Sequence, residues 1–173
     1  MNLKEIIRVI PDFPKPGIQF IDITTLLKDG KAMRCAFDQL AAMVQHLEID
    51  LLVGPEARGF LVGAPLAYKL GAGFVPVRKS GKLPGEVIEA SYQLEYGQDT
   101  LQIHKDAITP GTKVLVVDDL LATGGTVWST ADLVRSLGGE IVGFAFLVEL
   151  NFLKGRDKLG SHPVFSLLEY DSE

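Results

Sequence analysis

The sequence predicts an α/β fold in which a mainly parallel central sheet is flanked by helices. Apolar segments at residues 50–54, 73–77, 112–119 and 140–150 have the composition of strands that are buried on both faces. Segments with a helical spacing of apolar residues lie between most of these strands. Strands that alternate with helices in this way form one parallel sheet with helices on both of its faces.

The expected helices follow in chain order. Residues 3–10 predict a short amphipathic helix, because apolar side chains recur there at helical steps, and the prolines of residues 11–16 end it. Residues 31–47 predict a longer helix, since their apolar positions recur at steps of three and four. Two further helices are expected at residues 59–70 and 124–137.

Residues 79–110 interrupt the alternation of strands and helices. The segments 86–96 and 99–105 are rich in β-prone residues and alternate in part, and glycines and Pro84 flank them. We therefore expect a mobile β-hairpin, or flap, inserted in the α/β core.

Length and composition predict one globular domain. The chain has 173 residues, of which 47% are hydrophobic, so residues 1–173 are expected to form a single domain. The formal net charge of −5 argues against a nucleic-acid partner, since such surfaces need a positive excess. The single cysteine, Cys35, excludes an internal disulfide and fits a reducing compartment. No segment has the length of a membrane span, so we expect a soluble, cytoplasmic protein without a membrane partner.

The chemistry is expected at residues 114–126, VLVVDDLLATGGT, where a buried strand runs into two acids and a glycine-rich loop. Ligands of open α/β sheets bind at the carboxyl ends of the strands. Burying Asp118 and Asp119 is costly unless hydroxyls, a metal or a cation pair with them. Gly124 and Gly125 let a ligand approach the backbone, and the N-terminus of the following helix favours an anion. The motif therefore predicts a cup for one phosphate, with two acceptors for an adjoining sugar.

Two other phosphate-binding motifs fit the sequence poorly. The segment that begins at Gly54 has the spacing of a P-loop, but Phe60 and Leu61 stand where Lys and Ser or Thr are required. The segment that begins at Gly71 starts like a dinucleotide fingerprint, but it ends in Pro76 and precedes a strand instead of following one. An ordinary P-loop is therefore excluded, and dinucleotide binding is disfavoured.

Residues 114–126 resemble the motif with which type I phosphoribosyltransferases bind 5-phosphoribosyl-1-pyrophosphate (PRPP), and the Asp-Asp-Leu-Leu-Ala form resembles the adenine-specific branch of that family. Further similar segments follow in the expected order along nearly the whole chain: PDFPKPGIQFIDITTLL, GPEARGF, VRKSGKLPG, SYQLEYG, LVELNFLKGRDKL and FSLLEY. The resemblance implies the type I phosphoribosyltransferase fold, with a small N-terminal hood at about residues 1–25 and a flexible flap at about residues 79–110. It also implies a homodimeric enzyme of purine salvage that uses Mg²⁺ and converts adenine and PRPP to AMP and pyrophosphate.

The resemblance assigns a role to each part of the motif. Asp118 and Asp119 would bind the ribose hydroxyls, directly or through Mg²⁺, and Asp119 would act in catalysis, because the charge of the acids also stabilises a cationic sugar. The 5'-phosphate would be bound by Ala122, Thr123, Gly124, Gly125 and Thr126.

Pyrophosphate needs cations, because it leaves with high negative charge. The basic residues expected to bind it are Arg58, Arg78, Lys79 and Lys82. By resemblance, the turn at residues 56–59 forms the pyrophosphate loop. Glu95 on the flap matches the catalytic glutamate of the family, which lies near the base and the reacting carbon when the flap closes.

The base is expected at the hood. Backbone groups around Gln19 and Ile21 would read the purine edge, and Phe20 and Ile21 would supply apolar cover. A transferase for 6-oxopurines is the runner-up, and the preference among bases separates it from an adenine enzyme. A regulator that binds PRPP and also DNA or RNA is the alternative from another class; it would carry an extra nucleic-acid domain or a basic face, and the sequence shows neither.

Overall fold

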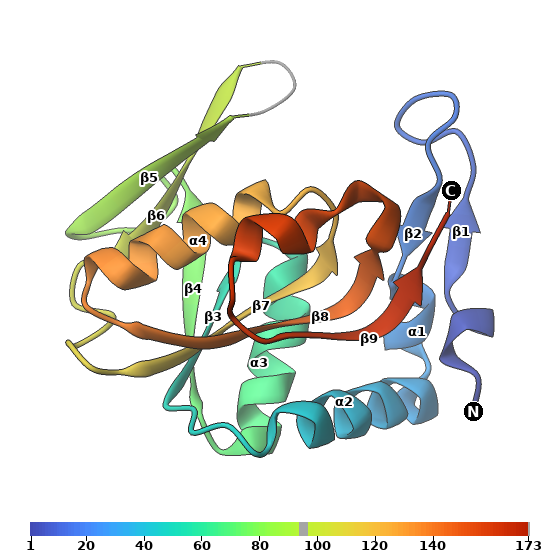
Figure 1. Ribbon diagram of the computed structural model, residues 1–173, viewed down its shortest axis with the longest axis horizontal. Helices are drawn as coiled ribbons and strands as arrows, with labels where there is room; N and C mark the ends of the chain where they lie inside the picture. Colours follow the sequence, from blue (N-terminus) through green and yellow to red (C-terminus); the bar gives the residue numbers. More distant parts are fainter. Residues whose placement is uncertain (94–96, 173) are drawn as a thin grey trace.

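The structure is a computed structural model that describes residues 1–93 and 97–172, and one large sheet forms its centre (Figure 1). Within the described residues this sheet has seven strands, in the order β5–β6–β4–β3–β7–β8–β9. Strands β4, β3, β7, β8 and β9 are parallel neighbours, so the predicted mainly parallel sheet is confirmed. The bounds are β3 Leu51–Pro55, β4 Gly73–Lys79, β5 Val87–Gln93, β6 Gln98–His104, β7 Lys113–Leu121, β8 Glu140–Leu150 and β9 Val164–Tyr170.

The helices α2, α3 and α4 flank the sheet, close to the three ranges predicted for longer helices. Asp29 caps α2, because its Oδ1 atom accepts hydrogen bonds from the amides of Lys31 and Ala32 at 2.9 and 3.0 Å. Gly71, with a φ of 69°, ends α3 in the left-handed conformation that glycine adopts without strain. The bounds are α2 Gly30–Val44, α3 Arg58–Leu70 and α4 Gly125–Ser136.

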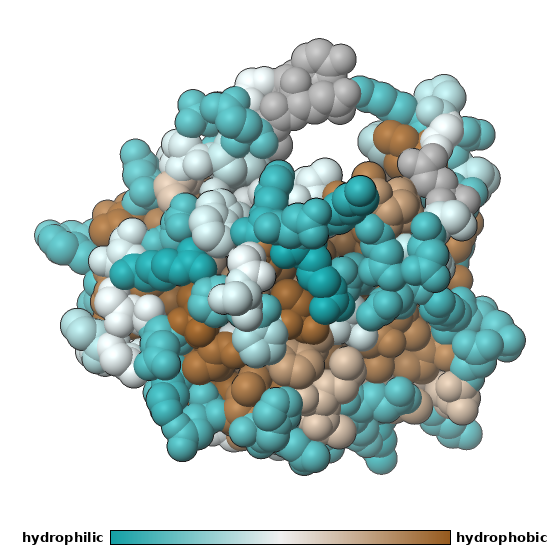
Figure 2. All heavy atoms as spheres, viewed as in Figure 1, coloured by the Kyte–Doolittle hydropathy of each residue, from teal (hydrophilic) through white to brown (hydrophobic). Residues whose placement is uncertain are grey.

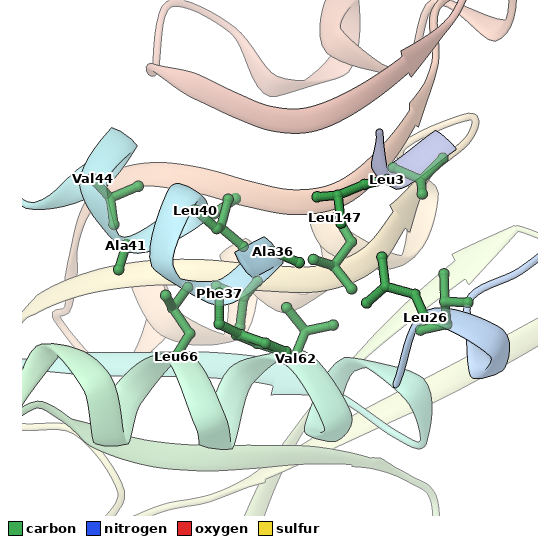
Figure 3. Packing of buried hydrophobic residues seen from close by; sticks show 14 of the residues in the cluster. Leu3, Leu26, Ala36, Phe37, Leu40, Ala41, Val44, Val62, Leu66 and Leu147 are labelled. Atoms are coloured by element: carbon green, nitrogen blue, oxygen red, sulfur yellow. The ribbon is translucent and has the colours of Figure 1, made fainter. Parts of the chain in front are cut away.

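The hydrophobic core has two layers, one on each face of the sheet. Figure 3 shows the layer in which side chains of α2 and α3 pack toward Leu147 of β8. Side chains of α4, such as Val127, pack into the second layer. Alternate residues of β8 serve the two layers, since Ala145 and Leu147 belong to the first and Phe144 and Phe146 to the second. A strand that is buried on both faces has this continuous apolar composition.

The N-terminal segment corrects one prediction. Instead of an amphipathic helix over residues 3–10, the chain forms one 3₁₀ turn, η1 Leu3–Glu5, and then the strand β1 Arg8–Ile10. Strand β1 pairs antiparallel with β2 Phe20–Asp22, and the short helix α1 Thr24–Lys28 follows. The apolar residues at positions 6–10 are β-branched, and Pro11 disfavours a helical conformation just before it, so pairing with β2 is preferred.

The expected β-hairpin is present at the edge of the sheet. Strands β5 and β6 pair with each other along their whole length, and β6 joins the sheet through an antiparallel contact with the end of β4. Figure 1 shows the hairpin and the β1–β2 hood on opposite sides of the molecule, and both rise above the central sheet in this view. The motion of the flap stays a prediction.

The connection from β8 to β9 consists of two short 3₁₀ turns, η2 Asn151–Leu153 and η3 Gly155–Leu159. The other parallel strands were predicted from their alternation with helices. Because no α-helix lies between β8 and β9, this alternation does not predict β9. Of the helices in the described part of the chain, none combines the length and the apolar composition needed to cross a membrane.

Candidate active site

A pocket of about 200 Å³ lies at the carboxyl end of β7. It is lined by Arg58 at the start of α3 and by residues 118–127, which run from the end of β7 into α4. The structure therefore brings together the paired acids, the glycine-rich loop and one of the four predicted basic residues. This is the position at which ligands bind in parallel α/β sheets.

The glycine-rich loop leads directly into the N-terminus of α4. Gly124 is the N-cap residue with a φ of 86°, and none of the described side chains caps this end of the helix. The first backbone bond of the turn runs from Trp128 N to Gly124 O, so the amides of residues 125–127 have no acceptor within the helix. Free amides and the positive end of the helix dipole favour an anion at this point.

The two acids lie in different surroundings within the pocket. Asp119 is only 3% exposed, and its Oδ2 atom lies 3.1 Å from Arg58 Nε in an ion pair. Among the described residues, that Oδ2 atom has no partner with hydrogen-bond geometry. Asp118 is partly exposed, and its Oδ1 atom accepts a hydrogen bond from the Asp119 amide at 2.8 Å. Burial raises the pKa of Asp118 well above its ordinary value, and the charge of Asp119 raises it further.

The turn from β3 to α3 carries Arg58 and is tied to the end of β4. The peptide bond between Glu56 and Ala57 is cis. The side-chain Oε1 atom of Glu56 accepts hydrogen bonds from Lys79 N at 2.7 Å and from Arg78 Nε at 3.3 Å. Glu56 therefore links the Arg58 turn to the guanidinium of Arg78 and to the backbone of Lys79. The sequence predicted Glu56 as part of the pyrophosphate loop but not these contacts, because the partners of Glu56 lie 22 and 23 residues away.

The predicted cations do not all reach the pocket. Arg58 lines it, and Arg78 connects to the Arg58 turn through Glu56. Lys79 forms an ion pair with Asp99 of the hairpin, with Nζ and Oδ2 separated by 3.4 Å. Lys82 is exposed and does not line the pocket.

The three residues predicted to bind the base face two different places. The Phe20 ring lies beside the Arg58 guanidinium, 5.3 Å from ring centre to Cζ. Gln19 and Ile21 instead line an apolar cavity of about 360 Å³. Successive residues of a strand point to opposite faces, which separates Phe20 from its neighbours. The other lining residues are Val9 and Ile18, which lie within the predicted hood, and Leu150, Phe152, Leu153, Tyr170 and Ser172, to which the sequence assigned no role.

Figure 2 shows hydrophobic residues beside the hood, next to hydrophilic ones on the same face of the molecule. The cavity lies where the hood meets the carboxyl end of β8 and the end of β9. The sequence signal for this cavity was the apolar run of β8. The last residue of that strand, Leu150, lines the cavity. Glu95, the predicted catalytic glutamate, lies outside the described residues.

Comparison with known proteins agrees with this geometry. A family model described as the phosphoribosyl transferase domain matches residues 25–167. That range includes the paired acids, the glycine-rich loop and Arg58. The chain therefore belongs to the phosphoribosyltransferase family.

Relatives that match along the full length of the chain belong to one branch of this family. The chain is 63% identical over 170 residues to the adenine phosphoribosyltransferase of Alkaliphilus metalliredigens, a match that spans 98% of this chain and 100% of the relative. The adenine phosphoribosyltransferase of Brevibacillus brevis is 59% identical over the same shares of the two chains.

Solved structures show the same likeness. The crystal structure of adenine phosphoribosyltransferase from Thermoanaerobacter pseudethanolicus is 56% identical, with a TM-score of 0.95 over 97% of this chain and 98% of that one. The enzyme of Saccharomyces cerevisiae, solved in complex with adenine and an imino-altritol bisphosphate, is 45% identical, with a TM-score of 0.88 over 96% of each chain.

Proposed function

We infer that the protein transfers the phosphoribosyl group of PRPP to adenine, giving AMP and pyrophosphate in purine salvage. The observation that carries this inference is the pocket at the end of β7, where two carboxylates, an arginine and the N-terminus of α4 meet. The names of the full-length relatives support adenine as the acceptor.

The reaction sets three demands on the site. A bond forms between N9 of adenine and C1 of the ribose, the bond from C1 to the pyrophosphate oxygen breaks, and the N9 proton is lost. By analogy with glycoside chemistry, C1 carries positive charge in the transition state. The site must therefore hold anions near the ribose and cations near pyrophosphate, and it must exclude water.

The glycine-rich loop suits the 5'-phosphate of PRPP. The amides at the start of α4 lack helical acceptors, and the absence of a side chain on Gly125 leaves room for phosphate oxygens. Ala122, Thr123 and Thr126 complete the proposed cup, and the threonines offer hydroxyl donors.

The paired acids suit the ribose. Sugar hydroxyls that donate to Asp118 and Asp119 would offset the cost of burying two carboxylates side by side. The negative charge of Asp119, held by Arg58 at the wall of the pocket, would stabilise the cationic C1. These are the proposed ribose-binding roles, and Asp119 is also a proposed catalytic residue.

Magnesium fits the acidic side of the pocket. Mg²⁺ is usually held by one or two carboxylates together with substrate phosphates. Asp118 and the buried Oδ2 atom of Asp119 are oxygen donors of this kind. Within the described residues, no group of three or more His, Cys, Asp or Glu side chains could hold a metal. We expect the ion to come with PRPP, where it neutralises charge on the pyrophosphate.

Pyrophosphate is expected on the side of Arg58. The turn that carries Arg58 is joined by Glu56 to the guanidinium of Arg78 and to the backbone amide of Lys79, which supports a shared role for Arg58 and Arg78. One well-placed donor of this type typically contributes about 10²–10³ in turnover. Lys82 has the weakest support of the four, because it is exposed and away from the pocket.

Adenine is expected beside the hood. Phe20 lies against Arg58 at the pocket, so a base next to C1 would contact this ring. The neighbouring cavity at Gln19 and Ile21 would supply apolar walls, and backbone groups of β2 would read the purine edge. A carbonyl that faces the 6-amino group selects adenine, because a 6-oxopurine leaves buried groups unpaired. Glu95 would handle a proton of the purine or stabilise the transition state.

A second copy of the chain is the expected partner. Leu61 and Tyr68 on α3 are 46% and 90% exposed, and their spacing of seven residues puts them on one side of the helix. Exposed large apolar side chains that gather on one face commonly mark a protein contact. We expect this face of α3 in the homodimer interface, and we expect the enzyme in the cytoplasm.

The proposed reaction is tested by mixing the protein with PRPP, Mg²⁺ and each of adenine, hypoxanthine, guanine and orotate in turn. Release of pyrophosphate with adenine alone supports the proposal. A preference for hypoxanthine or guanine would replace adenine by a 6-oxopurine. PRPP binding without release for any base would point to a PRPP sensor.

A further inference from the structure

The 3₁₀ turn η3 packs directly on the glycine-rich loop that is proposed to bind the 5'-phosphate. A Cβ atom on Gly155 would lie 2.3 Å from the carbonyl oxygen of Ala122 and 2.9 Å from Leu121 Cδ1. A Cβ atom on Gly124 would in turn lie 2.8 Å from the carbonyl oxygen of Gly155. The two backbones therefore touch at Ala122 and at Gly124, and no side chain larger than hydrogen fits between them.

An ion pair with the buried side chain of Glu149 fixes the residue that follows Gly155. Arg156 donates from Nε to Glu149 Oε1 at 2.8 Å and from Nη2 to Oε2 at 2.6 Å. Glu149 is 3% exposed, lies next to the end of β8, and also accepts a hydrogen bond from Ser166 Oγ at 2.5 Å. The planar fork of arginine matches both oxygens of a carboxylate, so this pair fixes direction as well as distance.

Further contacts hold the same turn on its other sides. Arg156 Nη1 donates to the carbonyl of Val164 at 3.2 Å, and Nη2 lies 3.7 Å from Glu169 Oε1. Leu159, the last residue of η3, is fully buried in the core layer that also contains Leu121. The turn is thus anchored to β8, β9 and the core, and the buried backbone of Gly155 is the part that contacts the glycine-rich loop.

We propose that Arg156 is a positioning residue for the glycine-rich loop. Its ion pair with Glu149 holds the Gly155 backbone against Ala122 and Gly124, and this contact keeps the loop in the shape that binds the 5'-phosphate of PRPP. The proposal rests on the inferred phosphoribosyl transfer. It adds a residue that lies outside the pocket and touches no substrate.

The test uses the full-length protein with Mg²⁺. Three variants change the contact between η3 and the glycine-rich loop or the ion pair that holds it: Gly155→Ala, Arg156→Lys and Arg156→Met. Two matched controls do not: Lys158→Met on the exposed side of the same turn, and Gly30→Ala, where a Cβ atom meets nothing within 4 Å. The readouts are the dissociation constant of PRPP without base, the KM for PRPP, the KM for adenine, kcat and the melting temperature.

We expect Gly155→Ala and Arg156→Met to weaken PRPP binding about tenfold, which corresponds to the loss of one or two hydrogen bonds to the phosphate. Arg156→Lys is expected to fall between these variants and the wild type, because lysine keeps the charge but not the fork. The KM for adenine stays within about twofold, since the base binds elsewhere. Both controls are expected to behave as the wild type does.

A lower melting temperature with unchanged PRPP binding in Gly155→Ala and Arg156→Lys would overturn the proposal and leave the pair a structural role alone. Arg156→Met leaves the buried charge of Glu149 unpaired, so this variant has the greatest tendency to misfold. If it misfolds, Gly155→Ala and Arg156→Lys decide the test. If the wild type binds PRPP but forms no AMP, the inferred reaction fails. The binding measurements still decide whether Arg156 positions the loop.

Discussion

At the scale of single residues, Asp119 combines burial, a negative charge and an arginine neighbour. Its carboxylate is 3% exposed and pairs with Arg58 at 3.1 Å. Asp119→Asn keeps the shape of the side chain and removes the charge that would stabilise the cationic sugar. We expect kcat to fall by about 10²–10³, the usual effect of losing one electrostatic group in an active site.

Turnover and thermal melting followed by circular dichroism test this prediction together. Asp157→Asn is the matched control, because Asp157 is exposed and lies away from the pocket. Unchanged turnover in a natively folded Asp119→Asn protein would show that the assigned role is wrong.

Gly124 meets two constraints at once. Its φ of 86° is unfavourable for other residues, and a Cβ atom would lie 2.8 Å from Gly155 O. Gly124→Ala is therefore expected to raise the KM for PRPP by about tenfold or more, because the loop must shift. Steady-state kinetics with varied PRPP measure the change.

Gly111→Ala separates the contact from the backbone strain. Gly111 has a φ of 85°, but a Cβ atom there meets nothing within 4 Å. Both variants lose stability from strain, and only Gly124→Ala is expected to affect PRPP. An equal KM for PRPP in the two variants would count against the assignment of the loop.

The residues of the pocket differ in how far the sequence could predict them. Asp118, Asp119 and the glycine-rich loop are contiguous, so a short pattern identifies them, and the structure brings them together. Glu56 and Arg156 lie outside the pocket, and their contacts join segments that only the fold brings together. Glu56 contacts Lys79 across 23 residues, and no local spacing marks such a contact.

At the scale of elements, the hood shows why a local pattern can mislead. Apolar residues at positions 3, 6, 7 and 10 fit a helix, yet positions 8–10 form a strand. The partner strand β2 decides this outcome, and the ion pair between Arg8 and Asp22 joins the two strands. The longer helices were predictable, because their periodic patterns extend over three turns or more.

Asp22 makes the stability of the hood depend on pH. Hydrogen bonds from Thr24 and Arg8 lower the pKa of Asp22 from 3.8 to about 2. Because the folded pKa lies below the unfolded one, the stabilisation is complete above the unfolded pKa and is lost as the pH falls toward the folded pKa. The melting temperature of Asp22→Asn should therefore lie furthest below that of the wild type at neutral pH, and the gap should close between about pH 5 and pH 2.

Melting curves recorded across this pH range provide the measurement. Asp106→Asn, a change at an exposed acid, is the control and should show no such gap. A difference between Asp22→Asn and the wild type that stays constant with pH would contradict the proposed linkage.

At the scale of the whole molecule, the α3 face predicts association. A double variant, Leu61→Asp with Tyr68→Asp, places two charges on the exposed apolar side of α3 and should disrupt a contact between copies. Light scattering after size exclusion should give twice the chain mass of 18.8 kDa for the wild type and the single mass for the variant. Leu153→Asp, at another exposed leucine, should keep the mass of the wild type. A wild type of single mass would refute the dimer.

The sheet as a whole was predictable in kind but not in every pairing. Apolar strands between helices indicated the parallel part, and the structure confirms it. The attachment of the hairpin to β4 and the place of β9 at the far edge depend on contacts between distant segments. Phe20 points to one face of β2 and its neighbours Gln19 and Ile21 point to the other. Which residue points to which face depends on the pairing of β2 with β1.

The central claim is that the acids and the loop at the end of β7 serve phosphoribosyl transfer to adenine. The most direct test is to measure AMP and pyrophosphate together, from labelled adenine and a limiting amount of PRPP, for the wild type and Asp119→Asn. The account predicts one AMP and one pyrophosphate for each PRPP consumed by the wild type, and a greatly reduced rate in the variant. Pyrophosphate formed without AMP, or equal rates in the two proteins, would contradict it.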